Sequence, residues 1–285
     1  MHIAPMNHFP WLFDLPSRAG LTPVYPEVGL PHTCSILCAM AGDQGDRDPA
    51  GVRRVRAPNP SPLTLDGTNT YVVAGWVVDP GPADEGHLQA VRHAAGAPLE
   101  GIVLTHSHGD HADGAQPLSQ REGGVPVVLP RDGQEIGPFQ AVATPGHAPD
   151  HISLITAGGV CFAGDLVMGL GSVFIDPGEG SLAAYLDSLR RMRELELSVL
   201  CPGHGPYVWD PPAKLDEYVA HRLERERLLL GALSAGARTE DELLDRAWSD
   251  APPALRPAAA LTLRAHLRKL ADEGRLPAGL EGDLL

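Results

Sequence analysis

Three histidines and one aspartate lie within a single stretch of six residues, 106–111. The surrounding sequence, THSHGDH at residues 105–111, directly follows the apolar run at residues 101–104. Imidazoles and a carboxylate are costly to place this close together unless a cation neutralises and orients them, and a divalent metal does both. The pattern therefore predicts metal ligands rather than an ordinary polar loop.

Three more residues of ligand type each lie beside a glycine further along the chain. They are His147 in TPGH, Asp165 in FAGD and His204 in CPGHGP. Glycine lets the backbone turn tightly, as ligands from distant parts of the chain require when they converge on one centre. The remaining histidines outside these motifs are expected to be surface or cap residues. They are His2, His8, His32, His87, His93, His221 and His266.

Short β-rich runs alternate with helical patterns from about residue 52 to residue 210, which is typical of a layered α/β domain. Strands are expected at 70–74, 76–79, 102–105, 125–129, 141–144, 151–156, 160–163 and 198–201. Helices are expected at 84–95, 114–120 and 181–196, the last with Ser181 as its N-cap. Most candidate ligands then follow the ends of strands, where α/β sheets place their sites.

A helical unit is expected after Pro211 and Pro212, which we interpret as a break in the chain. Its helices are predicted at 214–232, 239–248 and 257–273, and Thr239 with Glu242 has the form of a capping box. This order favours a small winged-helix-like domain. A helical buttress is the alternative, because the tail is slightly acidic whereas DNA-reading modules carry a basic face.

These observations divide the chain into three parts. Residues 1–50 are expected to form a loosely ordered extension, 51–212 the catalytic domain and 213–285 the helical domain. Met40 is an alternative start of the protein. The apolar patch at residues 11–15 has two interpretations, a surface buried in a homodimer or a segment folded back on its own domain.

The charge of the chain restricts its partners. Lys and Arg total 22 against 36 Asp and Glu, a formal net charge of −14, which excludes general coating of nucleic acids but not specific handling of one. The sequence has no GxxxxGK loop, so an NTP-driven reaction is disfavoured.

Four cysteines are too few for a disulfide scaffold, and the CxxxC pair Cys34 and Cys38 has no second Cys or His pair nearby for a zinc knot. No stretch reaches the ~20 apolar residues of a membrane helix. We expect a cytoplasmic protein without a membrane partner.

With these motifs the sequence resembles the metallo-β-lactamase superfamily over about residues 52–210. The resemblance implies an αββα sandwich with two metal ions at one edge of its sheets. It assigns the first metal to His106, His108 and His147, the second to Asp110, His111 and His204, and a bridging role to Asp165. Two Zn²⁺ are the expected cofactors. Mn²⁺ and Fe²⁺ stay open, because related manganese phosphodiesterases and iron-dependent persulfide dioxygenases keep similar motifs.

The identity of individual ligand residues disfavours two reactions that are known within the superfamily. The zinc β-lactamases generally use other residues at the positions of His111 or Asp165, so antibiotic hydrolysis is not favoured. Flavo-diiron proteins usually carry a glutamate where this chain has His108, so oxygen reduction is disfavoured too. The resemblance thus points to hydrolysis by a metal-bound hydroxide.

A narrower resemblance rests on TLDGTNTY at 64–71, PGHAPDH at 145–151, HRLERE at 221–226 and AHLRKL at 265–270. These stretches are similar to the β-lactamase-like protein 2 group, which appends a winged-helix-like tail to the catalytic domain. The group includes a mitochondrial endoribonuclease acting on single-stranded RNA and fungal relatives that cleave carrier-protein thioesters. The N-terminal extension and the sequence GLGS at 169–172 depart from the group in the region that would select the substrate.

Several residues near the ligands receive roles of their own. Asp110 is expected to act as a ligand and to orient the attacking hydroxide or move a proton. Asp79 is expected to accept a hydrogen bond from a ligand imidazole or the metal loop. His151 is predicted to be catalytic, by donating to the substrate or orienting a ligand, with a structural hydrogen bond as the alternative. Thr68 and Asn69 are expected to shape the pocket or to form a turn.

The leading prediction for the substrate is a single-stranded RNA phosphodiester, which rests on the resemblance and is opposed by the acidic charge. The alternative is a small-molecule ester, such as a thioester or a lactone, which needs no basic surface. A third hypothesis makes the tail a DNA-binding regulator with a metal-sensing domain. Salt-dependent binding of duplex DNA would support it.

Overall fold

The computed structural model describes residues 47–277, and its first sheet has five strands in the order β1-β2-β3-β4-β5. Strands β1, β2 and β3 pair antiparallel, whereas β4 pairs parallel to β3 and to β5. Ala74 and Gly75 both have positive φ in the turn between β2 and β3, as a two-residue hairpin with the native twist requires. The strands are β1 Val52–Arg56, β2 Asn69–Val73, β3 Trp76–Val78, β4 Gly101–Val103 and β5 Val127–Val128.

The second sheet also has five strands, in the order β10-β9-β8-β7-β6. Strands β6 to β9 pair antiparallel in sequence order, and β10 joins the edge of β9 in parallel. The strands are β6 Glu135–Ile136, β7 Phe139–Ala143, β8 Ile152–Thr156, β9 Val160–Gly164 and β10 Val199–Pro202. The register of β10 against β9 shifts between Cys201 and Pro202, next to the segment that carries His204.

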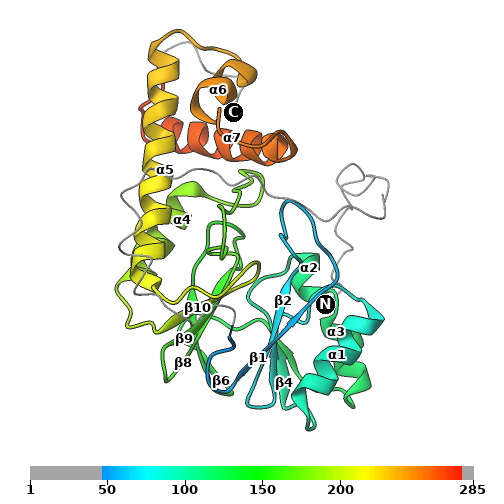
Figure 1. Ribbon diagram of the computed structural model, residues 1–285. Coiled ribbons are helices and arrows are strands. Elements are labelled where there is room, and N and C mark those ends of the chain that lie inside the picture. Colours follow the sequence, from blue (N-terminus) through cyan, green and yellow to red (C-terminus); the bar gives the residue numbers. More distant parts are fainter. Residues whose placement is uncertain (1–46, 278–285) are drawn as a thin grey trace, which may run out of the picture. The chain divides into compact units, whose positions relative to one another are not determined.

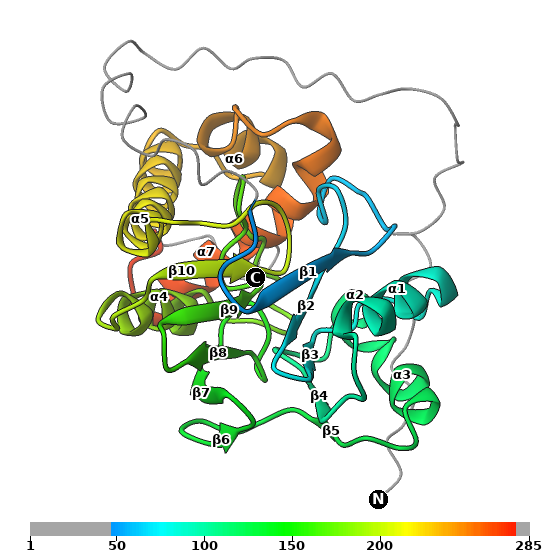
Figure 2. The ribbon, with the colours of Figure 1, turned by 60° about the horizontal axis from the view of Figure 1, so that its bottom comes forward.

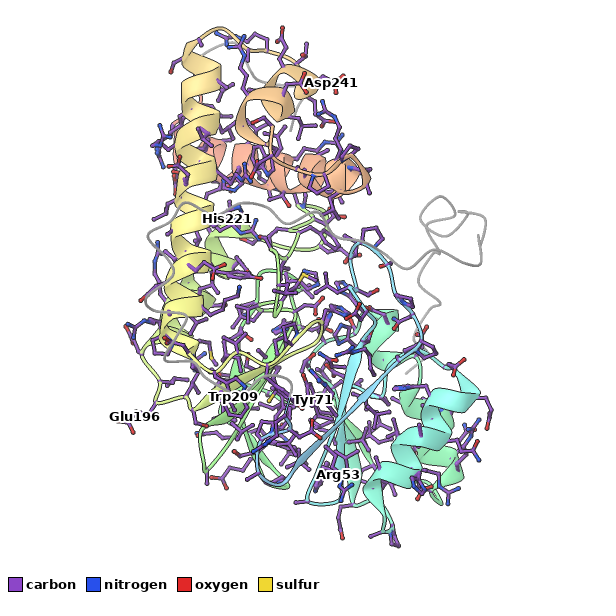
Figure 3. The ribbon with its side chains drawn as sticks, viewed as in Figure 1. Arg53, Tyr71, Glu196, Trp209, His221 and Asp241 are labelled. Carbon is purple, nitrogen blue, oxygen red and sulfur yellow. The ribbon has the colours of Figure 1, made fainter. Side chains whose placement is uncertain are left out.

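The two sheets pack face to face with helices on both outer faces (Figures 1 and 2). Helices α1 Glu85–Ala95 and α3 Ala115–Arg121 cover the first sheet, and their apolar faces share a core with Val77 and Ile102. Helix α4 Leu182–Arg193 covers the second sheet. Tyr71, labelled in Figure 3, belongs to the core between the sheets. The αββα sandwich expected from the resemblance is confirmed.

Most elements of this sandwich lie within two or three residues of their predicted bounds, and Ser181 caps α4 as expected. Strand β1 was not predicted, because its sequence VRRVR places three arginines in five residues and its burial does not alternate regularly. The two-residue strand β6 and the short helix α2 Gly109–Ala112 were missed for a different reason. Elements this short carry no period that a sequence pattern can show.

The C-terminal part is helical and has its own apolar core. It consists of α5 Pro211–Ser234, α6 Glu240–Ala247, a short 3₁₀ turn at Pro253–Leu255 and α7 Arg256–Asp272. The capping box of Thr239 and Glu242 is confirmed. The prediction that Pro211 and Pro212 break the chain before a helix was wrong, because they form its first turn, where a missing amide donor costs nothing.

Helix α5 contributes to two cores. Leu215 and Tyr218 pack with α4 in the core under the second sheet, whereas Leu229 and Leu233 pack with α6 and α7. The helix therefore links the sandwich to the terminal helices without an intervening linker, and the division between residues 212 and 213 stays a prediction.

Several predictions fall wholly or partly outside the described residues. The apolar patch at residues 11–15 and the pair Cys34 and Cys38 lie there entirely, as does most of the predicted extension 1–50. Within residues 47–277, Cys161 and Cys201 are free thiols buried in the core. No helix in that range is long and apolar enough to cross a membrane.

Two histidines that were predicted to lie at the surface or at caps are buried instead. The His87 ring lies under α1 with Nε2 2.9 Å from Oγ1 of Thr70. His266 on α7 is fully buried beside the edge of the Trp248 ring, and neither of its ring nitrogens has a hydrogen-bond partner within the described chain. Both rings lie on the buried face of their helix.

Burial of His266 makes the stability of the fold depend on pH. Burial, followed by the nearby cations Arg222 and Lys269, holds its pKa well below 6.5, so the folded chain keeps the ring neutral. The unfolded chain takes up the proton below its ordinary pKa of about 6.5, and folding stability therefore falls as the pH drops. When the pH drops from about 7.5 to about 5.5, one such group lowers the free energy of unfolding by about 1.4 kcal/mol.

We expect the free energy of unfolding of His266→Leu to fall less than that of the wild type between about pH 7.5 and about pH 5.5, and the difference to be about 1.4 kcal/mol. Urea unfolding of both proteins at the two pH values measures the difference. The metal centre is the same in both proteins, so its own pH dependence cancels in the comparison. Equal losses in the two proteins would show that His266 is not held neutral.

Candidate metal centre

The histidine-rich segment connects the end of β4 to the short helix α2. His106 and His111 are fully buried, while the side chains of His108 and Asp110 are partly exposed. His108 occupies the N-cap position of α2 without capping it by its side chain. His106 and His111 are therefore fixed in the core, whereas His108 and Asp110 lie toward the outside.

A first cluster of ligand atoms forms around His108. Its Nδ1 lies 3.0 Å from Nε2 of His106 and 3.1 Å from Nε2 of His147. Oδ2 of Asp165 is 3.5 Å from the same nitrogen of His147. Three imidazoles from two loops and a carboxylate at the end of β9 thus converge on one point.

A second cluster lies next to the first. Oδ2 of Asp110 is 3.6 Å from Nε2 of His111 and 3.4 Å from Nε2 of His204. Oδ1 of Asp165 lies 3.4 Å from both of these nitrogens. Asp165 therefore presents one oxygen to each cluster, which is the arrangement of a bridging carboxylate.

The atoms at the centre suit a divalent cation. Nε2 of His111 and Oδ1 of Asp165 are buried and have no hydrogen-bond partner within residues 47–277. The triads His106, His108, His147 and Asp110, His111, His204 each offer ligand atoms within 4.8 Å of one another. Imidazole nitrogens with carboxylate oxygens suit zinc, iron and manganese alike. A divalent cation bound there would satisfy the buried atoms that the protein leaves unpaired.

Electrostatics agree with this interpretation. Burial, together with His111 and His151, keeps the pKa of His106 well below its usual value. Burial opposes ionisation of Asp110, yet His111 and His204 outweigh it and lower its pKa to about 2. Burial likewise opposes the charge of His204, but Asp165 and Asp110 raise its pKa to about 9. Protons therefore balance the two carboxylates in the second cluster, and a bound cation would displace them.

Asp79 holds the back of the site, as predicted. Its Oδ1 accepts the backbone amide of Thr105, and its Oδ2 accepts the Thr105 hydroxyl at 2.7 Å and Nδ1–H of His111 at 2.9 Å. The residue has φ +48°, a region that a non-glycine residue rarely adopts. These three bonds orient His111 and the loop. Asp79 also lies with His106 and His111 in a third group whose ligand atoms are within 4.8 Å of one another.

Two glycines let the loops approach one another. A Cβ at Gly203 would lie 2.5 Å from Cε1 of His111 and 2.6 Å from Oδ1 of Asp165. At Gly164, where φ is +47°, a Cβ would lie 2.5 Å from Oγ1 of Thr105. Both glycines are thus required for close packing around the centre, and of these two only Gly164 also has a positive φ.

Thr68 and Asn69 stabilise the loop of His204. Nδ2 of Asn69 donates to the carbonyls of Pro202 and Gly205, on either side of that histidine. Thr68 forms an isolated bridge with His204, and its hydroxyl lies 3.5 Å from Oδ2 of Asp110. Both residues lie against the metal centre, as the prediction that they shape the pocket requires.

His151 lies behind the ligands and is buried. Its Nε2 accepts the backbone amide of Asp165 at 3.0 Å, and its Nδ1 lies 2.8 Å from the Thr144 hydroxyl. Both ring nitrogens are therefore engaged within the protein. This geometry fits either orientation of a ligand or the alternative of a structural hydrogen bond, and it leaves no ring nitrogen to donate to a substrate.

Sequence analysis missed three groups that support the site. Oε2 of Glu179 lies 3.2 Å from Nε2 of His108, and the carbonyl of Phe174 lies 3.1 Å from Nδ1 of His147. The side chain of Asn59 bonds both the amide and the hydroxyl of Thr68. No motif or spacing marks these residues, and a carbonyl has no sequence signature at all.

Known proteins share both parts of this architecture. A family model described as the metallo-beta-lactamase superfamily matches residues 63–139 and 123–204. A second model, described as the beta-lactamase associated winged helix domain, matches residues 239–277. The winged-helix-like tail predicted from the sequence thus agrees with a known domain family.

Similar curated proteins extend over most of the chain. A beta-lactamase-like protein 2 homolog of Caenorhabditis elegans is 30% identical over 254 residues, covering 78% of this chain and 85% of the relative. The lactamase-like protein adaB of Aspergillus niger is 31% identical, covering 81% and 83%.

Solved structures resemble this one at similar coverage. A metallo-beta-lactamase family protein of Thermus thermophilus is 25% identical with a TM-score of 0.65, covering 79% of this chain and 94% of that one. A beta-lactamase domain protein of Burkholderia ambifaria is 22% identical with a TM-score of 0.66, covering 81% and 88%, and supports the fold.

The role of Asp79 can be tested by replacing it with asparagine, which keeps the shape but turns one acceptor oxygen into a donor. We expect Asp79→Asn to weaken divalent-metal binding by about 10- to 100-fold, because His111 loses its acceptor. Competition with a chromogenic chelator measures the affinity. Asp187→Asn, on the exposed side of α4, is the matched control and keeps wild-type affinity. Equal affinities for the two variants would exclude this role for Asp79.

Proposed function

The chain belongs to the metallo-beta-lactamase superfamily, and we propose that it is a hydrolase whose two clusters hold two divalent cations. The convergence of His106, His108 and His147 beside Asp110, His111 and His204 carries this proposal, with Asp165 between them. Zinc is the first candidate, with manganese and iron as alternatives, since all three accept nitrogen and oxygen ligands. When bound, such ions lower the pKa of a water molecule from ~15.7 toward ~7 and polarise the bond to be cleaved.

The residues of the chain have separate tasks in this reaction. Asp110 stays ionised near neutral pH because its pKa is about 2. Its carboxylate faces the open side of the centre and can orient the attacking water or accept its proton. Asp79, His151 and Asn69 hold ligands or their loops from behind. The Thr68 hydroxyl donates to Asp110 and limits its rotation.

The surroundings of the metal centre support an ester-type substrate, such as a thioester or a lactone. Leu170 is 60% exposed, and the neighbouring amide of Gly169 donates to the carbonyl of His204. A Cβ at Gly205 would touch Leu65 and the backbone of Leu170. Two leucines thus lie beside the His204 loop, where apolar side chains favour the acyl part of a substrate.

The loop of Leu170 is firmly held. The hydroxyl of Tyr218, on α5, accepts the amide of Met168 and donates to the carbonyl of Gly171. A large apolar side chain is therefore kept exposed by buried hydrogen bonds, rather than by a loop free to fold away. This arrangement supports a binding role for Leu170.

Single-stranded RNA, which the sequence analysis placed first, is the second candidate. The match of residues 239–277 to a winged helix domain and the four basic residues of α7 favour it. Against it stands the pairing of basic side chains in the helical part with carboxylates. Arg225 pairs with Asp250, Arg256 with Asp241 and Asp245, Arg264 with Glu240, and Lys269 and Arg275 with Glu226. The same pairing weighs against the third hypothesis, a DNA-binding regulator, which loses its support if duplex DNA is not bound at low salt.

The first experiment compares turnover of acyl thioesters, lactones and labelled single-stranded RNA by the metal-loaded protein. We expect hydrolysis of at least one ester-type substrate, and its loss by at least about a hundredfold in His108→Ala and in Asp110→Ala, because each variant removes a ligand. Retained turnover in both variants would refute the metal mechanism. Metal-dependent RNA cleavage that Asp110→Ala abolishes, without ester hydrolysis, would establish the second candidate.

A second experiment tests Leu170, the exposed apolar side chain beside the His204 loop. We expect Leu170→Ser to raise KM for a medium-chain acyl thioester by about tenfold with little change in kcat, because the acyl chain loses apolar contact. Leu223→Ser, at an exposed leucine of α5, is the matched control and keeps the wild-type KM. An unchanged KM in Leu170→Ser would remove this residue from the substrate site.

A further inference from the structure

One segment of the chain contacts both the metal centre and the C-terminal helices. Residues 173–179, called the strap below, connect the loop after β9 to the start of α4. Val173 and Ile175 of the strap are buried in the same core as Tyr185 and Ala265. The strap is thus packed into the protein along its first half.

On one side the strap contacts two candidate metal ligands. The carbonyl of Phe174 accepts Nδ1–H of His147 at 3.1 Å, and the carboxylate of Glu179 accepts Nε2–H of His108 at 3.2 Å. These bonds leave Nε2 of His147 and Nδ1 of His108 unprotonated, and both of those atoms belong to the first cluster. The strap therefore selects the tautomer in which each ring presents a lone pair to a metal.

On the other side the strap is bonded to α5 and α7. Arg222 of α5 donates to the carbonyl of Val173. The amide of Ile175 donates to Oγ1 of Thr262 at 3.2 Å, and Arg268 donates to the carbonyl of Pro177 at 3.2 Å. Residues 173, 175 and 177 therefore bond to helices, while residue 174 between them bonds to a ligand.

The bond to Arg222 is costly to build. Its side chain is only 2% exposed, and burial of a guanidinium requires compensation. The carbonyl of Val173 and the face of the Tyr185 ring, 5.3 Å away, supply part of it, whereas Nε of Arg222 has no hydrogen-bond partner among residues 47–277. Because the carbonyl of Val173 is the bonded partner of this buried guanidinium, moving the strap away would leave the charge further uncompensated.

We propose that the C-terminal helices position His108 and His147 for metal binding through the strap, with Glu179, Thr262 and Arg268 as positioning residues. This inference rests on the proposed metal centre. It gives the helical domain a task at the first cluster that needs no nucleic acid. Loosening the strap from α7 frees the two imidazoles to rotate, and a metal must then order them on binding.

Arg268 offers the sharpest test because α7 also carries a matched control. Arg268 and Arg264 are both exposed arginines, four residues apart on one helix. Arg264 pairs instead with Glu240, the first residue of α6. We expect Arg268→Ala to weaken metal binding by about tenfold, whereas Arg264→Ala keeps wild-type affinity. Chelator competition without substrate measures both.

Two more variants separate positioning from folding. Thr262→Val keeps the shape of the side chain and removes the acceptor of Ile175, so its metal affinity is expected to fall as in Arg268→Ala. Glu179→Ala is expected to weaken binding, and Glu179→Gln to restore it, because the amide oxygen still accepts from His108. The absorption of bound Co²⁺ reports the coordination geometry, and we expect its spectrum to change in Glu179→Ala but not in Glu179→Gln.

Kinetics on the best substrate add an independent readout, since kcat is expected to fall with little change in KM. If Arg268→Ala and Glu179→Ala bind metal as tightly as Arg264→Ala and give the wild-type Co²⁺ spectrum, the strap does not position the ligands. If the wild-type chain binds no metal, the proposed function itself fails. This outcome differs from wild-type metal binding by Arg268→Ala and Glu179→Ala, which would overturn only the role of the strap.

Discussion

The structure depends on the crowding of five imidazoles and two carboxylates into one largely buried centre. Their ring nitrogens and oxygens approach within 3.0 to 3.6 Å of one another, and Nε2 of His111 and Oδ1 of Asp165 have no hydrogen-bond partner in the described chain. Unpaired buried polar atoms are destabilising, and each added proton or charge shifts the others. Bound divalent cations would remove this conflict, and the rest of the fold keeps these side chains converging.

Convergence is achieved by loops between rigid strands. The ligands follow β4, β7, β9 and β10, so both sheets contribute to one edge of the sandwich. Groups behind the ligands then set the direction of each ring, with Asp79 at His111 and the Phe174 carbonyl at His147. Because each of these bonds fixes a tautomer, the site is preorganised before any cation arrives.

The helical part is integrated with this support. Helix α5 begins in the core under the second sheet, and α7 bonds the strap that touches His108 and His147. Its basic side chains mostly pair with carboxylates of the same part, which leaves little free positive charge for a phosphate backbone. The paired charges of the tail and the exposed leucine beside the His204 loop are the observations on which the proposed ester-type substrate rests.

The residue pattern by itself predicted a cluster of ligand-type side chains, a layered α/β domain and the capped helices, whereas the sandwich followed from the resemblance to the superfamily. The candidate ligands lie in short glycine-flanked motifs, and apolar runs mark the buried strands, so local patterns carry both signals. Tertiary structure decided what depends on distant contacts: that Glu179 reaches His108, that His151 faces inward, and that His266 is buried. These outcomes depend on which surfaces meet after folding, and a linear pattern does not record them.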